Sequence, residues 1–134
     1  MSYFVTTARI LLGLIFLIFG LNGFYTFIPV PEFHPFMELL VESGYIYLIK
    51  TVEIIAGIML LLNRCVPLAL TLLAMDIVNI TAYHVLLDPR NWGIVPVIIT
   101  LWIIVFLNYR SSFDALFKMK PEGNRSRIGE NRAR

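Results

Sequence analysis

Several polar side chains stand inside stretches of the sequence that are otherwise apolar. An ionisable side chain at the centre of a membrane helix costs at least ~2.5–3.5 kcal/mol, so each needs a partner or has a use. In one apolar run, Asp76, Asn79 and Tyr83 are spaced i, i+3 and i+7. In the preceding run, Lys50 and Glu53 are three residues apart. The spacing predicts a polar column, closed toward the cytoplasm and open toward the outside, formed by Asn22, Lys50, Glu53, Asp76, Asn79, Tyr83 and His84.

Two interpretations of this column stay open. In the first, the side chains only hold the helices together, through interhelical hydrogen bonds that join Lys50 to Glu53, Glu53 to Asn79, and Asn22 to Tyr83 or His84. In the second, they line an outward-facing pocket for a small polar or amphipathic ligand, or a proton-handling site. Glu53 is expected to be paired with Lys50 or to carry a proton, because an isolated carboxylate at membrane depth is too costly.

No catalytic residue or metal site is predicted. His34 and His84 could clamp a metal or haem in principle, but nothing in their spacing supports it. No phosphate-binding glycine loop, zinc-protease helix or nucleophile elbow occurs in the sequence, and independent enzymatic activity is not expected. Cys65 is the only cysteine, which excludes an internal disulfide and any redox cysteine pair.

The elements that position these residues are apolar runs long enough for membrane helices. The chain has 58% hydrophobic and 15% charged residues, compared with about 45–50% and about 25% in soluble domains. The sequence predicts an all-α membrane protein, a bundle of four transmembrane helices at about residues 4–27, 45–62, 66–87 and 92–109. Small residues, Gly13, Gly20 and Gly23 on the first run and Ala56 and Gly57 on the second, predict close packing between helices.

The segment between the first two spans, about residues 28–44, is too polar to cross a membrane. Its apolar side chains Phe33, Phe36, Met37 and Leu40 fall on one helical stripe. This predicts a short helix in the membrane interface, with Pro35 in its first turn, or else a loop packed against the end of the bundle.

Lysine and arginine predict the orientation of the spans. Nine of the eleven basic residues fall on the side that carries both termini and the turn at Arg64. Both termini are therefore expected in the cytoplasm, with residues 1–110 as the transmembrane domain and 111–134 as a basic polar tail. Arg9 and Lys50 are expected to extend toward opposite membrane surfaces.

Several stretches in order resemble the DoxX family of four-span membrane proteins: Arg9–Gly13, Gly20–Phe24, Val52–Gly57 up to Arg64, Val78–Ile80 and Tyr83–Pro89. The resemblance covers about residues 8–89. The resemblance implies an association with membrane redox complexes that handle quinols and sulfur compounds. It also implies that Glu53 and His84 match the polar positions of the family pattern. Asp76 stands where an apolar residue or proline is usual in that family.

Two functions follow from these observations. The first is a redox-associated accessory subunit of the bacterial inner membrane whose outward polar pocket binds a quinone-like or small polar ligand. The second is a non-enzymatic component that supports membrane assembly or trafficking, with its polar groups serving helix packing only. Expected partners are the lipid bilayer, a membrane or periplasmic redox enzyme and a second copy of the chain; nucleic acid is not expected, and quinone is the one cofactor considered.

Overall fold

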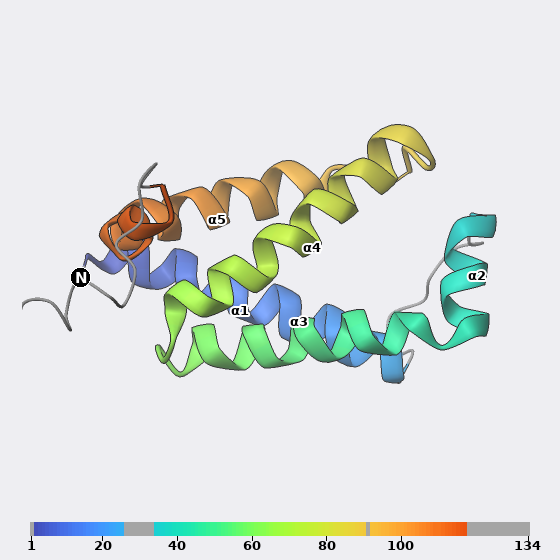
Figure 1. The fold of residues 1–134 in the computed structure, drawn as a ribbon, viewed down its shortest axis with the longest axis horizontal. Coiled ribbons are helices and arrows are strands. Elements are labelled where there is room, and N and C mark those ends of the chain that lie inside the picture. The colour runs from blue at the N-terminus through green and yellow to red at the C-terminus, as the bar shows by residue number, and fades with distance from the viewer. Residues whose placement is uncertain (1, 26–33, 91, 118–134) are drawn as a thin grey trace, which may run out of the picture.

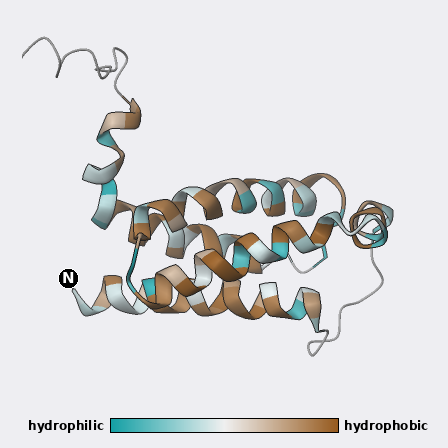
Figure 2. Cartoon of the chain, turned by 60° about the horizontal axis from the view of Figure 1, so that its bottom comes forward, coloured by the Kyte–Doolittle hydropathy of each residue, from teal (hydrophilic) through white to brown (hydrophobic). Residues whose placement is uncertain are grey.

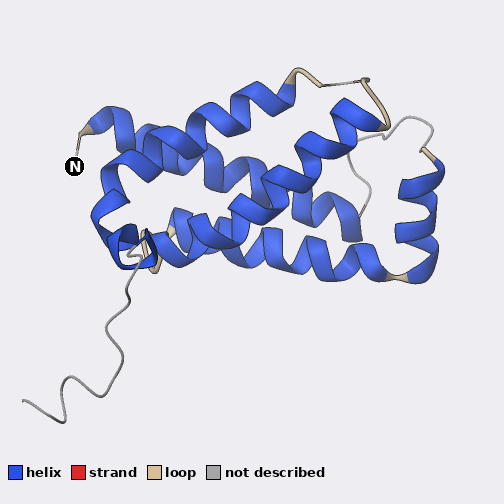
Figure 3. Ribbon diagram, turned by 45° about the horizontal axis from the view of Figure 1, so that its top comes forward, coloured by secondary structure: helices blue, strands red, loops and turns tan. Residues whose placement is uncertain are grey.

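The computed structural model describes residues 2–25, 34–90 and 92–117, and every element within these ranges is helical (Figure 3). The elements are α1 (Tyr3–Phe24), α2 (Pro35–Ser43), α3 (Tyr45–Leu61), α4 (Val66–Leu86), α5 (Ile94–Tyr109) and the 3-10 helix η1 (Arg110–Phe117). The bounds of α1, α3, α4 and α5 agree with the four predicted runs to within three residues.

The long helices run back and forth along one axis (Figure 1). The N-terminus, the turn between α3 and α4, and η1 gather at one end of the bundle, which we call the η1 end. The connection between α4 and α5 lies at the opposite end with α2, and we call this the α2 end. The core between the helices contains Leu12, Phe16, Leu60, Leu70, Leu73, Ile98 and Val105, all essentially inaccessible.

Glycines bring α1 and α3 into close contact, as the sequence predicted. A Cβ atom at Gly57 would come within 2.8 Å of the carbonyl oxygen of Gly13, and one at Gly20 within 3.0 Å of the carbonyl oxygen of Lys50. The backbones therefore approach more closely than side chains at these positions would allow. This contact fixes α3, and with it Lys50 and Glu53, against the first helix.

The predicted short helix is present as α2, although the beginning of its segment lies outside the described residues. Pro35 occupies its first turn, and His34 Nδ1 accepts a hydrogen bond from the backbone N–H of Phe36 at 3.1 Å. Gly44 ends α2 in the left-handed conformation, with φ of 80°, which glycine adopts without strain. The chain then turns by 86° into α3, so α2 lies across the end of the bundle.

The outward surface of the helices is largely apolar (Figure 2). Tyr3–Phe24, Val66–Leu86 and the combined stretch Ile94–Phe117 are long and apolar enough to cross a membrane. By itself, α3 has 17 residues, which at ~1.5 Å per residue falls short of the ~30 Å hydrocarbon core. The chain is an integral membrane protein with three candidate spans, or up to four if the bent pair of α2 and α3 counts as one.

The chain stays helical beyond α5. Residues Arg110–Phe117, most of which were expected in the polar tail, form η1, and Phe113 is buried against Phe106 with ring centroids 5.0 Å apart. The remainder of the predicted tail, 118–134, lies outside the described residues. The packed domain thus extends past residue 110.

Candidate functional site

Three ionisable side chains from two helices meet inside the bundle, and we call Lys50, Glu53 and Asp76 the carboxyl cluster. Lys50 Nζ lies 3.1 Å from Glu53 Oε2, and it donates to both oxygens of this carboxylate. The Glu53 side chain is 3% exposed and that of Lys50 is 20% exposed. Because the two residues are three apart on α3, the helix itself brings their side chains together.

Asp76 approaches this pair from α4. Its carboxyl group lies within hydrogen-bonding reach of the Glu53 carboxyl group and close to the ammonium of Lys50. Asp76 is 9% exposed, and its Oδ2 atom is buried with no hydrogen-bond partner among the described residues. Two buried carboxyl groups therefore face one ammonium group.

A glycine of α1 gives Lys50 its position. A Cβ atom at Gly23 would lie 2.4 Å from Lys50 Cγ and 2.7 Å from its Cδ, so the aliphatic chain of Lys50 occupies the space that a larger residue would fill. The lysine stem is thus held against α1 while its ammonium reaches Glu53. The sequence predicted Gly23 as a packing residue and did not connect it with Lys50.

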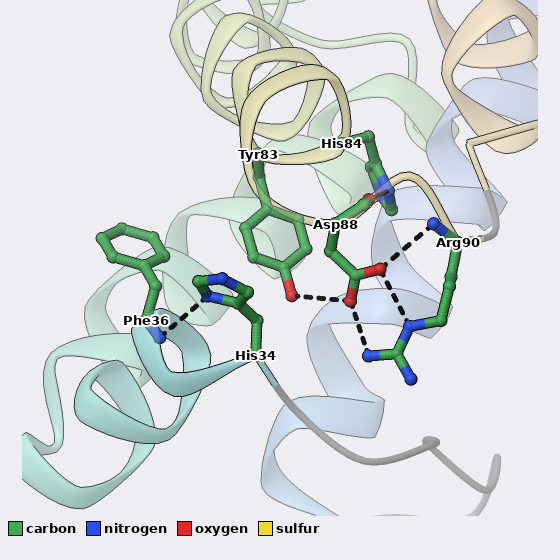
Figure 4. Close-up of polar contacts among 6 residues, drawn as sticks. All are labelled: His34, Phe36, Tyr83, His84, Asp88 and Arg90. Carbon is green, nitrogen blue, oxygen red and sulfur yellow. Dashed lines mark hydrogen bonds and ion pairs between the residues drawn. The ribbon is translucent and has the colours of Figure 1, made fainter.

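A second polar group, which we call the end cluster, lies at the α2 end and consists of Tyr83, His84, Asp88 and Arg90 (Figure 4). The Asp88 carboxylate accepts hydrogen bonds from Arg90 Nε at 2.8 Å, Arg90 Nη2 at 2.7 Å and the Tyr83 hydroxyl at 3.4 Å. The hydrogen bonds from the Arg90 guanidinium hold the pKa of Asp88 well below its usual range. Asp88 is therefore ionised and paired.

His84 is oriented by the same turn. Its Nδ1 lies 3.1 Å from the backbone carbonyl oxygen of Asp88. A carbonyl only accepts hydrogen bonds, so this contact requires the proton on Nδ1, and in the neutral ring Nε2 is then an acceptor. The end cluster thus combines an acceptor nitrogen with a phenol and a guanidinium.

Helix α2 closes over Tyr83. The ring of Tyr83 lies edge-on to the ring of His34, with centroids 6.2 Å apart, and 6.2 Å from the ring of Phe36 (Figure 4). The rings of Tyr83 and His84 are 5.3 Å apart. No group of three or more histidine, cysteine, aspartate or glutamate side chains within the described ranges could hold a metal ion.

The predicted column is therefore divided. Lys50, Glu53 and Asp76 come together, and Tyr83 and His84 come together about two helical turns further along α4. Asn79 lies between them but is exposed, and its side chain donates to the carbonyl of Met75 at 3.0 Å, one turn earlier. Asn22 is half-buried near the α2 end of α1. The helix rotation that brings Asp76 toward Glu53 turns Asn79 outward.

Sequence reasoning missed Asp88 and Arg90 as members of a site. Both stand in a stretch dense in turn formers that connects two of the predicted spans. The available signal was an acidic residue followed two positions later by a basic one, beside a tyrosine and a histidine in the preceding helix turn. That pattern favours a closed polar turn, because the intervening proline restricts the backbone.

Arg9 does not extend out of the bundle as the sequence predicted. Its side chain is 7% exposed and donates to the backbone carbonyl oxygens of Leu60 and Leu61 at the end of α3. Carbonyls in the last helical turn lack intrahelical partners and carry partial negative charge, so they attract a cation. The prediction that the Arg9 side chain extends to the membrane surface was wrong, because the end of α3 presents these carbonyl oxygens at the depth of Arg9.

An apolar groove of about 570 Å³ runs between α4 and α5 toward the α2 end. Its lining is Ile77, Val78, Thr81, Ala82, Val85, Leu86 and Ile99. The groove reaches Val85 and Leu86 on α4, which directly follow His84 of the end cluster in the sequence. The groove and the end cluster are therefore adjacent.

Comparison with known protein families shows which family the chain belongs to. The DoxX family model matches residues 4–85, which is more than half of the chain. The chain belongs to the DoxX family. The match includes both carboxyl groups of the carboxyl cluster, and it contains Tyr83 and His84 but ends before Asp88. No curated protein and no solved structure matches the chain of this DoxX protein.

Proposed function

We propose that this DoxX protein is a redox-associated accessory subunit of the bacterial inner membrane that binds a quinone-like ligand. The head group would lie against the end cluster, and the apolar tail would follow the groove between α4 and α5. The observation that carries this proposal is the apolar groove, whose lining on α4 reaches Val85 and Leu86, the two residues that directly follow His84. A ligand that is apolar along its length and polar at one end matches this arrangement.

The end cluster offers hydrogen bonds of both kinds to such a head group. A neutral His84 with its proton on Nδ1 presents Nε2 as an acceptor for a quinol hydroxyl. The Arg90 guanidinium, whose side chain is 51% exposed, can donate to a quinone carbonyl while it holds Asp88. The subunit would bind and orient the ligand for a partner enzyme and would not itself transfer electrons.

The test is the quinone content of the protein purified in mild detergent. We expect extracted lipid to contain quinone in proportion to the protein, measured by chromatography and absorbance. Ala82→Trp, which fills the groove, and His84→Ala should each reduce this content several-fold. Leu48→Trp is the matched control, because Leu48 is an exposed apolar residue on α3 away from the groove. Equal quinone in all four proteins, or none in the unaltered protein, would contradict the proposal.

We also propose four membrane crossings, with α3 completing the second and both termini in the cytoplasm. In the sequence, nine of the eleven basic residues fall at Arg9, at Arg64 or after α5, and this excess supports the orientation. Cys65 permits a direct test, because it is exposed in the turn between α3 and α4 and is the only cysteine. A thiol reagent that cannot cross membranes should label Cys65 in inverted vesicles and leave it unlabelled in intact cells. The opposite pattern would contradict the proposed orientation.

A second candidate function is a non-enzymatic component for membrane assembly or trafficking. It is favoured by two ion pairs within the chain, because Lys50 pairs with Glu53 and Arg90 pairs with Asp88. In that case the purified protein would contain no quinone, and variants of His84 would lose neither stability nor function. The lipid extract therefore distinguishes the two candidates.

A further inference from the structure

We propose that Glu53 and Asp76 bind one proton between them, and that Lys50 neutralises the negative charge that remains. The carboxyl cluster would thus be a single-proton site inside the membrane bundle. This inference goes beyond ligand binding at the end cluster and does not depend on it.

The first argument is the contact between the two carboxyl groups. They lie within hydrogen-bonding reach of each other, and both belong to nearly inaccessible side chains, 3% and 9% exposed. An ionised carboxyl group only accepts hydrogen bonds, so two carboxylates cannot form one with each other. A proton on either group turns the contact from a repulsion into a hydrogen bond.

The second argument is the balance of charge. An uncompensated charge is strongly disfavoured inside a membrane helix bundle. One ammonium balances one carboxylate, so the three side chains are neutral only when the second carboxyl group holds a proton. The buried Asp76 Oδ2 atom receives no hydrogen bond from a donor among the described residues, so a proton shared between the two carboxyl groups would supply the hydrogen that it lacks.

The neighbouring elements supply no other charge to the cluster. On α1 the only ionic residue is Arg9, whose side chain is bound to the carbonyls of Leu60 and Leu61, ~10 Å further along α3 than Glu53. Asn22, also on α1, is neutral. Helix α5 contains no aspartate, glutamate, lysine, arginine or histidine, and α4 contributes only Asp76 before Tyr83 and His84. Helix α2, which also packs against α3, carries Glu38 and Glu42, and both of these side chains are exposed. Among the described helices, the buried cluster therefore has one cation and two carboxyl groups.

A bound metal cation would also balance the charge, but the site suits a proton better. Hard cations such as Ca²⁺ and Mg²⁺ require about six or more oxygen ligands, including water. Here the ammonium of Lys50 already donates to both carboxylate oxygens of Glu53, and the described residues contain no group of three or more metal-binding side chains. A proton needs only the two carboxyl groups.

Lys50 is the most exposed member of the carboxyl cluster. Its side chain is 20% exposed, whereas Glu53 is almost inaccessible. The ammonium therefore lies between the Glu53 carboxyl group and the surface of the bundle, and we expect protons to exchange with the cluster past Lys50. The site can take up or release one proton without leaving a net charge only if Lys50 changes its protonation or position as well.

Infrared spectroscopy of the full-length protein tests the proposal. A protonated carboxyl group has a carbonyl stretching band separate from that of carboxylates, and it shifts in heavy water. At neutral pH we expect one such band in protein reconstituted in ester-free detergent. Labelling the aspartates or the glutamates of the unaltered protein with ¹³C should each shift part of the band, because the proton is shared.

Three variants give distinct results. Glu53→Gln and Asp76→Asn should each abolish the band, because the remaining carboxylate balances Lys50. Lys50→Met should roughly double it, because both carboxyl groups are then protonated. Glu42→Gln and Asp114→Asn, which alter exposed carboxyl groups, are the matched controls and should leave the band unchanged.

Four results would overturn the proposal. They are the absence of a protonated carboxyl band in the unaltered protein, a band that moves with only one of the two isotope labels, a band that survives in Asp76→Asn, and a band that appears only when sodium or calcium is removed. The last would identify a metal cation as the occupant. The isotope experiment requires no substitution, so it decides the matter even if a variant fails to fold.

Discussion

Replacing Glu53 by Gln and Lys50 by Met, singly and together, measures the interaction between their charges. The charges are 3.1 Å apart, and Coulomb's law at an effective dielectric constant of ~20 gives roughly 5 kcal/mol. Screening at the partly exposed Lys50, and the competing attraction of Asp76 for the same ammonium, reduce this value. We expect a coupling free energy of about 2 kcal/mol, within the range of ~0.5–3 kcal/mol found for residues in contact.

The four proteins should therefore differ in a definite pattern. Glu53→Gln alone should lower the free energy of unfolding by about 2 kcal/mol, because Lys50 loses its nearest partner. The same substitution in a Lys50→Met background should have little effect, since Gln then replaces a neutral carboxyl group of similar shape. Reversible unfolding in mixed detergent micelles, followed by circular dichroism, supplies the free energies. Additive effects, within ~0.5 kcal/mol, would refute the reasoning.

Other substitutions test the packing, the end cluster and the cysteine. Gly57→Ala should destabilise the protein by ~1–3 kcal/mol in the same assay, because its Cβ would come 2.8 Å from a backbone oxygen of α1; Gly93→Ala, with nothing within 4 Å, should be neutral. Because the pKa of Asp88 is lowered in the folded protein, its stabilisation is complete above the ordinary value of ~3.9 and is lost only as pH falls toward the folded value. Asp88→Asn should lose this stabilisation at neutral pH. In a Trp102→Phe background, which removes the other tryptophan, the fluorescence of Trp92 should report a looser turn whose signal no longer changes in acid. Cys65 should remain a free thiol, so electrophoretic migration of freshly alkylated membranes should be the same with and without reductant.

The sequence predicted the helices well because their limits are local. Apolar runs end at Asn63-Arg64 and at the turn before Pro89, and these breaks depend on residues next to them in the chain. The close approach of α1 and α3 could also be predicted, since glycine at Gly13 and Gly57 has few other uses in an apolar helix. Local signals could not predict whether α3 crosses the membrane by itself, because the bend at Gly44 leaves this helix with 17 residues.

The composition of the candidate site was harder to predict. The pair of Lys50 and Glu53 follows from helical spacing, but the neighbour of Glu53 on α4 depends on the rotation of one helix about its axis. A rotation of about 60° exchanges Asp76 for Asn79 on the face toward α3, and apolar sequences contain little information about so small an angle. The end cluster depends on the path of the chain after α4, where periodicity no longer applies.

The bond from Arg9 to the end of α3 has a consequence for how the protein is made. Arg9 belongs to a helix that leaves the ribosome before α3, and its acceptors, the carbonyls of Leu60 and Leu61, are synthesised some fifty residues later. Until then the guanidinium must remain hydrated or bound to lipid phosphate at the membrane surface. Insertion of α1 to its final depth is therefore coupled to the arrival of α3, and the α1–α3 pair is expected to assemble before α4 and α5 join it during biosynthesis.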